Sequence, residues 1–186
     1  MIPLKLKRRH LRAPLNNECL IKVDQHILKV NALNISEGGA LLSELPNLED
    51  RATITAFFEV PRLPSFSLMT TNDLFNLDRD KNFAEVQGVV LELKRKVLPN
   101  SQSGVVSGGF EFVDLRRESQ EKIKEYVSAF GANIVFTLSL FEQGVQKIEV
   151  KELIRKCVHA LGYPDKMSLG KIRETLLHDY QSLESL

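Results

Sequence analysis

Two short segments of the chain hold the residue types best suited to binding chemistry, and the first is a cluster of arginines. Arg8, Arg9 and Arg12 lie in a stretch from Lys5 to Arg12 that carries five cations and no acid. A guanidinium forms forked hydrogen bonds with a phosphate that a lysine ammonium cannot match. The cluster is therefore suited to an anionic ligand, and the same charge run is also typical of a solvated basic tail.

The second segment is Asn-Ile-Ser-Glu-Gly-Gly, from Asn34 to Gly39. Asn34 and Ser36 are two residues apart, so their amide and hydroxyl point to the same side of an extended chain. Gly38 and Gly39 allow either a close approach of backbone N–H groups or a tight turn with positive φ. One β-hairpin of roughly 20 residues separates this segment from the arginines, and its return would bring the two together. Taken alone, the segment is more typical of a solvated turn than of a binding site.

Length and composition indicate a globular protein with a real core. The chain has 186 residues, of which 43% are hydrophobic and 26% charged, enough for one domain or a compact domain with a small appendage. This composition excludes a wholly disordered chain. The formal net charge of +1 argues against a nucleic-acid footprint over the whole molecule, so we expect no DNA or RNA partner.

Targeting signals and chemistry-bearing clusters are both weak in the sequence. The start Met1–Lys5 lacks the apolar core of a signal peptide, and no apolar run approaches the ~20 residues of a membrane span. We therefore expect a cytoplasmic protein that is not embedded in a membrane. The two cysteines form no disulfide framework, the four histidines have no zinc spacing, and no nucleophile motif is present. We expect no metal, no cofactor and no enzymatic activity.

Short apolar segments separated by polar or glycine breaks predict six strands. They fall at about 19–23, 27–30, 39–42, 52–60, 84–97 and 105–113, with a turn at 99–101. This spacing favours an antiparallel barrel or sandwich. Residues 62–83 show no sustained period and are predicted to form a long loop that is functional or partly disordered.

Helical patterns occupy the rest of the chain. Asp114 is a predicted N-cap for a helix that ends at Gly131, with a Glu118–Lys122 pair on its surface and with apolar residues at Leu115, Ile123, Tyr126, Val127 and Phe130. The segment 134–141 fits either a strand or a buried helical turn. Residues 150–161 and a helix capped by Ser168 predict a helical hairpin. Its apolar face must cover the barrel or a second chain, so a homodimer through these helices is one alternative.

The two binding segments together resemble a known family. Arg-Arg-x-x-Arg upstream of Asn-x-Ser-x-x-Gly is similar to the motif pair of the PilZ domain, a bacterial receptor for cyclic di-GMP. The segments Ile35–Leu42 and Ser107–Leu115 also resemble the family's Ile-Ser-x-Gly-Gly-Ala segment and its last strand. The resemblance covers about residues 5 to 130.

The resemblance implies a fold and a domain organisation. The fold is mainly β, a six-stranded antiparallel β-barrel with a capping helix, followed by a C-terminal α-helical hairpin extension. We expect the receptor domain to span residues 1–131 and the mainly helical extension residues 132–186.

The resemblance also implies roles for individual residues. Arg8, Arg9 and Arg12 would hold the phosphates and the O6/N7 edges of guanine. Asn34 and Ser36 would hydrogen-bond the ligand, and Gly38 and Gly39 would leave room for a base. The strand at 89–93 departs from family members that place a stacking aromatic there.

The function that follows is a non-catalytic cyclic di-GMP effector of bacterial signalling. It would change conformation on binding and act through a protein partner. One alternative is a PilZ-type adaptor that binds pilus, flagellar or polysaccharide machinery without nucleotide. Another reads the helical hairpin as a DNA-binding helix-turn-helix, although acids dilute its cations.

Overall fold

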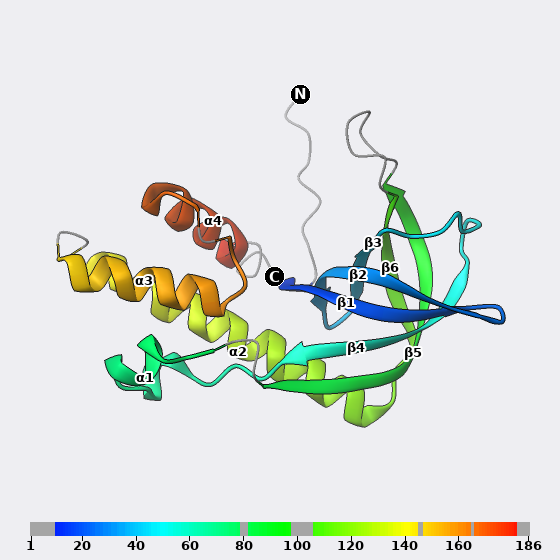
Figure 1. Cartoon of the computed structure of the whole chain (residues 1–186), viewed down its shortest axis with the longest axis horizontal. Coiled ribbons are helices and arrows are strands. Elements are labelled where there is room, and N and C mark those ends of the chain that lie inside the picture. The colour runs from blue at the N-terminus through cyan, green and yellow to red at the C-terminus, as the bar shows by residue number, and fades with distance from the viewer. Residues whose placement is uncertain (1–9, 79–81, 98–105, 145–146, 165, 182–186) are drawn as a thin grey trace. The chain divides into compact units, whose positions relative to one another are not determined.

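The computed structural model describes residues 10–78, 82–97, 106–144, 147–164 and 166–181, and combines a β-barrel with several helices (Figure 1). The strands are β1 (Ala13–Val23), β2 (His26–Ser36), β3 (Gly39–Ser43), β4 (Thr53–Pro61), β5 (Phe83–Val97) and β6 (Ser107–Asp114). The helices are η1 (Phe66–Leu68), α1 (Thr71–Phe75), α2 (Arg117–Glu142), α3 (Ile148–Ala160) and α4 (Leu169–Gln181).

The six strands close into an antiparallel barrel in the order β1-β2-β3-β6-β5-β4. Alternate residues of each strand point inward, and Ile21, Ala32, Ile35 and Leu91 are fully buried as a result. Closure leaves no free sheet edge, which suits strands this short. The predicted fold class, a mainly β chain with a six-stranded antiparallel barrel and added helices, is confirmed. The predicted turn at 99–101 lies outside the described residues.

The first turns of α2 are fastened to the barrel by side chains. The Tyr126 hydroxyl, 2% exposed as a residue, donates a hydrogen bond to the carbonyl of Pro14 at the start of β1. Lys122 Nζ donates to the Glu85 carbonyl of β5 at 3.0 Å. The predicted Glu118–Lys122 pair is present at 2.6 Å. The burial predicted for Ile123, Tyr126, Val127 and Phe130 is also confirmed.

Two expectations about α2 are wrong at its ends. Asp114 is the last residue of β6 rather than the N-cap, because the helix begins at Arg117. The helix also continues through Gly131 to Glu142, and Gly131 does not have positive φ. The apolar segment 134–141 is therefore helical, with Ile134 and Leu140 buried. Burial of this face outweighs the small helix penalty of one glycine.

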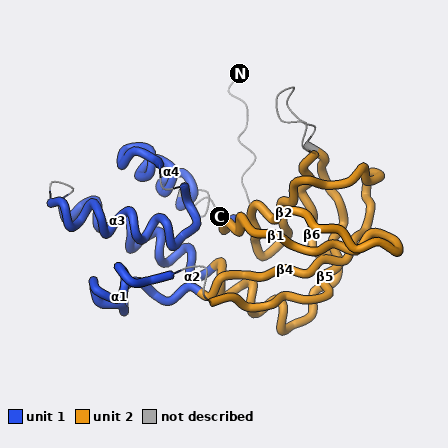
Figure 2. Tube along the Cα trace, in the orientation of Figure 1, with its two compact units in different colours: residues 1–12, 63–79, 128–186 blue, residues 13–62, 80–127 orange. Residues whose placement is uncertain are grey.

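The chain divides into two compact units, coloured differently in Figure 2. The barrel unit comprises residues 13–62 and 80–127, and the helical unit comprises residues 1–12, 63–79 and 128–186. The chain passes from one to the other within α2. Residues 63–79 therefore belong with helices that lie far along the sequence.

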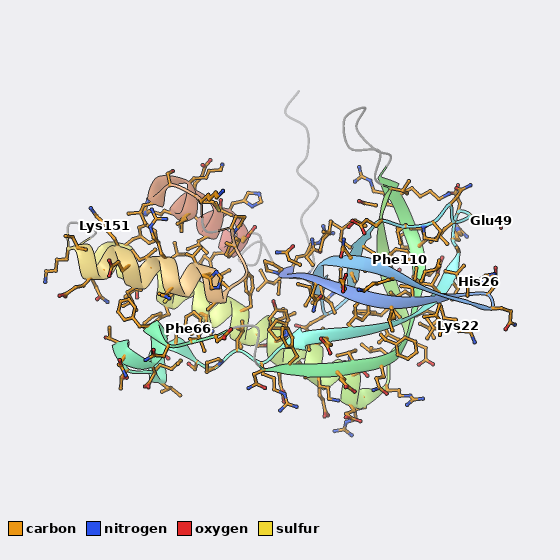
Figure 3. The ribbon with its side chains drawn as sticks, in the orientation of Figure 1. Lys22, His26, Glu49, Phe66, Phe110 and Lys151 are labelled. Carbon is orange, nitrogen blue, oxygen red and sulfur yellow. The ribbon has the colours of Figure 1, made fainter. Side chains whose placement is uncertain are left out.

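The segment predicted as a long loop is in fact folded within the helical unit. It forms η1 and α1, and a capping box starts α1: Thr70 Oγ1 accepts from Asp73 N at 3.2 Å, and Asp73 Oδ2 accepts from Thr70 N at 3.1 Å. The hydrogen bonds from Thr70 lower the pKa of Asp73. Phe66 (labelled in Figure 3) is fully buried and lies edge-on to Phe136, with ring centroids 6.2 Å apart. The segment has no helical or strand period because its order comes from long-range contacts.

Asn133 of α2 makes the central polar contact of this segment. It is 1% exposed, its Oδ1 accepts from Phe66 N at 2.9 Å, and its Nδ2 donates to the Pro64 carbonyl at 2.9 Å. One amide side chain thus satisfies two backbone groups that would otherwise be buried without partners.

The C-terminal hairpin follows its prediction closely. Ser168 Oγ accepts from Lys171 N at 3.3 Å, as expected of the cap of α4. The Tyr163 hydroxyl donates to Asp179 at 2.7 Å, and its ring lies 6.1 Å from that of Phe130. The apolar residues Ile154, Cys157, Val158, Ile172 and Leu176 are all buried within the single chain.

We predict that Asn133→Ala destabilises the protein by about 2–3 kcal/mol, because it leaves the buried N–H of Phe66 and the partly buried carbonyl of Pro64 without their partner. Urea unfolding at equilibrium measures this. Asn76→Ala is the matched control: its amide is exposed and bonds only within α1, so its cost should stay below about 0.5 kcal/mol. Equal costs for the two variants would contradict the role given to Asn133.

Candidate functional site

The polar segment singled out in the sequence forms the β2–β3 hairpin. Ser36 and Gly39 are register partners, and Glu37 and Gly38 form the turn between them. Ser36 is 8% exposed as a residue, and its hydroxyl donates to the Gly39 carbonyl at 3.2 Å. Because this bond uses its proton, the oxygen keeps lone pairs that can accept a hydrogen bond from a ligand.

Gly39 is required by the approach of β6 rather than by a turn. A Cβ at this position would lie 1.9 Å from the carbonyl oxygen of Phe110, so no side chain fits without separating β3 from β6. The Gly38 carbonyl accepts from Phe112 N at 3.1 Å, which joins the turn to the same strand. Neither glycine has positive φ. The close approach at Gly39 is that of β6, and the close approach of backbone N–H groups to a ligand stays a prediction.

The strand that follows the arginine motif in the sequence starts beside this hairpin. Pro14 pairs with Asn34 and Ala13 pairs with Ile35, so β1 starts opposite the residues of the polar segment. Arg12 is exposed and precedes Ala13 by one peptide bond. Arg8 and Arg9 lie outside the described residues. The structure therefore brings the Asn34–Gly39 segment and the first residues after the arginine motif together.

A row of register partners crosses the outer face of the barrel from Asn34. Successive register pairs join Asn34 to Leu41, Leu41 to Gly109 and Gly109 to Arg95, which makes one row across β2, β3, β6 and β5. Residues in such a row share a face. Gly109 adds no side chain, and the nearest atom to a Cβ there would be 3.9 Å away. The exposed Arg95 is thus the closing side chain of a row that begins at Asn34.

The sequence alone allows Lys94 and Arg95 to add charge after the strand at 89–93, but it favours a solvated strand end. The register of the strands instead makes Arg95 part of this row. Its basic type was visible, but nothing in the sequence gives the register of β5 against β6. A bulge between Leu93 and Arg95 sets which residues of this strand end face outward.

A second row on this face carries carboxylates and one amine that neutralises them. Gly39 pairs with Glu111, and Glu111 pairs with Glu92. Lys94 Nζ lies 2.9 Å from Glu92 and 3.1 Å from Glu111. Hydrogen bonds to Glu92 and then Glu111 raise the pKa of Lys94, which keeps it charged. Lys94 therefore reduces the negative charge that an anion near Ser36 would meet.

Other reactive chemistry is weak in the part of the chain that the structure describes. Burial raises the pKa of both Cys19 and Cys157 to about 12, so both thiols stay protonated at neutral pH. Within the described ranges, no three His, Cys, Asp or Glu side chains gather as a metal site would require. Among the described helices, none has the length and apolar character needed to cross a bilayer.

Comparison with family models assigns the chain. The model of the PilZ domain matches residues 6–129, about two thirds of the sequence and all six strands. The chain belongs to the PilZ domain family. A comparison with curated proteins finds no match.

Solved structures of similar fold have low sequence identity to the chain. The motility inhibitor MotI/DgrA of Bacillus subtilis is 10% identical, with a TM-score of 0.47 over 65% of this chain and 49% of the other. MrkH of K. pneumonia is 16% identical, with a TM-score of 0.43 over 66% of this chain and 47% of the other. The PilZ domain of YcgR from Escherichia coli, solved with c-di-GMP, is 15% identical, with a TM-score of 0.37 over 66% and 90%. The chain spans about half the length of MotI and MrkH.

We predict that Gly39→Ala destabilises the barrel by about 3 kcal/mol or more, because the added methyl overlaps the Phe110 carbonyl. Gly109→Ala is the matched control, since its methyl meets nothing closer than 3.9 Å. It should change the free energy of unfolding by about 1 kcal/mol or less. Thermal and urea unfolding compare the two, and a well-folded Gly39→Ala variant would disprove the close approach.

Proposed function

We propose that this chain is a receptor for cyclic di-GMP that works by binding and not by catalysis. The carrying observation is the register Pro14↔Asn34, which starts β1 directly after the arginine motif and opposite the polar hairpin. The PilZ family is a family of non-catalytic cyclic di-GMP receptors. Its two binding motifs are both intact in this sequence.

The ligand's chemistry matches the residues. Cyclic di-GMP has two phosphate charges and two guanines. Arg8, Arg9 and Arg12 supply forked donors for the phosphates and for the O6/N7 edge of guanine. Asn34 adds an amide donor and acceptor, and Ser36 adds an acceptor oxygen beside the turn.

The row that runs from Asn34 to Arg95 extends this proposed site. A guanine ring that reaches beyond Leu41 would lie over Gly109, where no side chain projects. At the end of the row, the Arg95 guanidinium can stack on the base or pair with a phosphate. This arginine takes the place of the aromatic residue that some family members carry on the equivalent strand.

The proposed signal is the ordering of the arginine segment by the nucleotide. Residues that gather around a dianion lose freedom and take one conformation, and a protein partner would read that change. In this proposal the partner-facing parts include the helical extension at 132–186, and the receptor domain is residues 1–131. The proposed setting is the cytoplasm, where the messenger is made.

Isothermal titration with cyclic di-GMP tests the proposal directly. The wild-type chain should bind, and Arg8→Ala and Arg12→Ala should each weaken binding at least about tenfold, because each removes charge-assisted hydrogen bonds to the dianion. Arg173→Ala is the control: it removes an exposed arginine from α4 and should leave affinity unchanged. Absence of binding by the wild type would favour the adaptor function that needs no nucleotide.

The carboxylate row gives a second, independent test. Lys94→Gln leaves Glu92 and Glu111 without their amine and should weaken nucleotide binding about fivefold, more strongly at low salt. Adding Glu111→Gln to that variant should restore most of the affinity. Lys171→Gln, which breaks an ion pair on α4, serves as the control. The same titration applies, and an unrestored double variant would contradict the electrostatic reading.

A further inference from the structure

The barrel has a second outer surface that the proposed nucleotide site does not use. An open groove of about 470 Å³ lies along β1, β4 and β5, with Cys19, Leu20, Phe57 and Phe58 on its apolar part. Lys29 of β2 also lines this groove, whereas Asn34 and Ser36 of β2 do not. We call this surface the β1–β4 groove.

The groove exposes large apolar side chains at one point. Leu20 and Phe57 are register partners on neighbouring strands, and they are 45% and 38% exposed. Alternation along a barrel strand places polar residues on the outer face, so an exposed leucine–phenylalanine pair is not explained by folding. Adjacent apolar side chains of this kind mark interaction surfaces.

The strands separate at the same place. Register pairs join β1 to β4 at Leu20↔Phe57, Ile21↔Ala56 and Lys22↔Thr55, close to the hairpin end where Lys22 is labelled in Figure 3. On the Asn17 side of Leu20, a side chain joins the two strands in place of a register pair: Asn17 Nδ2 donates to the Glu59 carbonyl at 2.7 Å. The groove is thus flanked by two strands that have begun to diverge.

Acidic residues border the apolar pair. Glu59 and Glu85 are register partners, and Glu18 lines the groove beside them. Like charges placed directly across a sheet are destabilising, so the Glu59–Glu85 pair costs the fold stability. Lys29 lies 2.5 Å from Glu18, whereas no cation of the described residues pairs with the carboxylate of Glu59 or Glu85. Within the described part of the chain, Glu59 and Glu85 therefore have no ion-pair partner, and Glu85 Oε2 accepts a hydrogen bond from Gln87 Nε2 at 2.6 Å.

We propose that the β1–β4 groove docks a segment of a partner protein that carries lysine or arginine beside a bulky apolar residue. The apolar residue would cover Leu20 and Phe57, and the cation would neutralise Glu59 and Glu85. Nucleic acids and anionic membranes are repelled by the same carboxylates, which makes a basic polypeptide the complementary occupant. This inference does not depend on which ligand the arginine motif binds.

A peptide pair of opposite charge tests the groove on the full chain without nucleotide. The probe is a fluorescent peptide of about ten residues in which lysine alternates with leucine and threonine, and its partner carries glutamate in place of lysine. Fluorescence anisotropy should show binding of the lysine peptide alone. The variant Glu59→Gln/Glu85→Gln, and separately Leu20→Ser, should each weaken it at least about tenfold.

The matched control removes the same charge elsewhere. Glu149→Gln/Glu152→Gln changes two exposed carboxylates of α3 and should leave the peptide's affinity within about twofold. Equal weakening by the control variant, or full binding by Glu59→Gln/Glu85→Gln, overturns the proposal.

Two further results would assign the groove to a different occupant and so overturn it as well. The first is a change of sedimentation coefficient in Leu20→Ser, which would make the groove a contact between copies of this chain. The second is tighter peptide binding after removal of residues 1–9, which would make the chain's own basic leader the occupant. All the substituted side chains are exposed, so each variant should fold. Circular dichroism checks this.

Discussion

The pairing of the first residues of β1 with the last residues of β2 is the constraint on which the rest of the molecule depends. Pro14 has no N–H to give to the ladder, and the register shifts between Pro14 and Asn17, with Asn16 at φ 53°. The carbonyl of Pro14 accepts a hydrogen bond from the Tyr126 hydroxyl of α2. One strand start thus fixes the polar hairpin, the entry of the arginine motif and the position of the helix against the barrel.

The sequence predicts those parts of the fold whose signals are local. Six strands, the Glu118–Lys122 pair and the Ser168 cap all follow from residues within a few positions of one another. The order of residues 63–78 has no such signal, because it rests on Asn133, about 70 positions away. A glycine in a helix reads locally as an end, and only the burial of Ile134 and Leu140 shows why α2 continues.

The residues of the candidate site also differ in whether a local sequence signal reveals them. Asn34, Ser36 and Gly39 can be found by spacing, since the alternation of a strand and a two-residue turn suffice to bring them together. Arg95 and the Lys94 bridge cannot, because both depend on a bulge in β5 and on the register of β5 against β6. The role of Gly39 is also non-local: the atom that excludes a side chain belongs to Phe110. Residue types were readable from the sequence, and cross-strand neighbours were not.

The two outer surfaces of the barrel show how register turns one composition into opposite chemistries. Near the polar hairpin, Lys94 sits between two carboxylates and an arginine closes the row, so the local field tolerates an anion. Along β1 and β4, Lys29 pairs with Glu18, and Glu59 is the register partner of Glu85 across the sheet. A net charge of +1 conceals this separation. Like charges across a sheet and exposed apolar side chains both reduce the stability of the isolated chain. A basic partner segment would neutralise the carboxylates and cover the apolar pair, so both features would then favour binding.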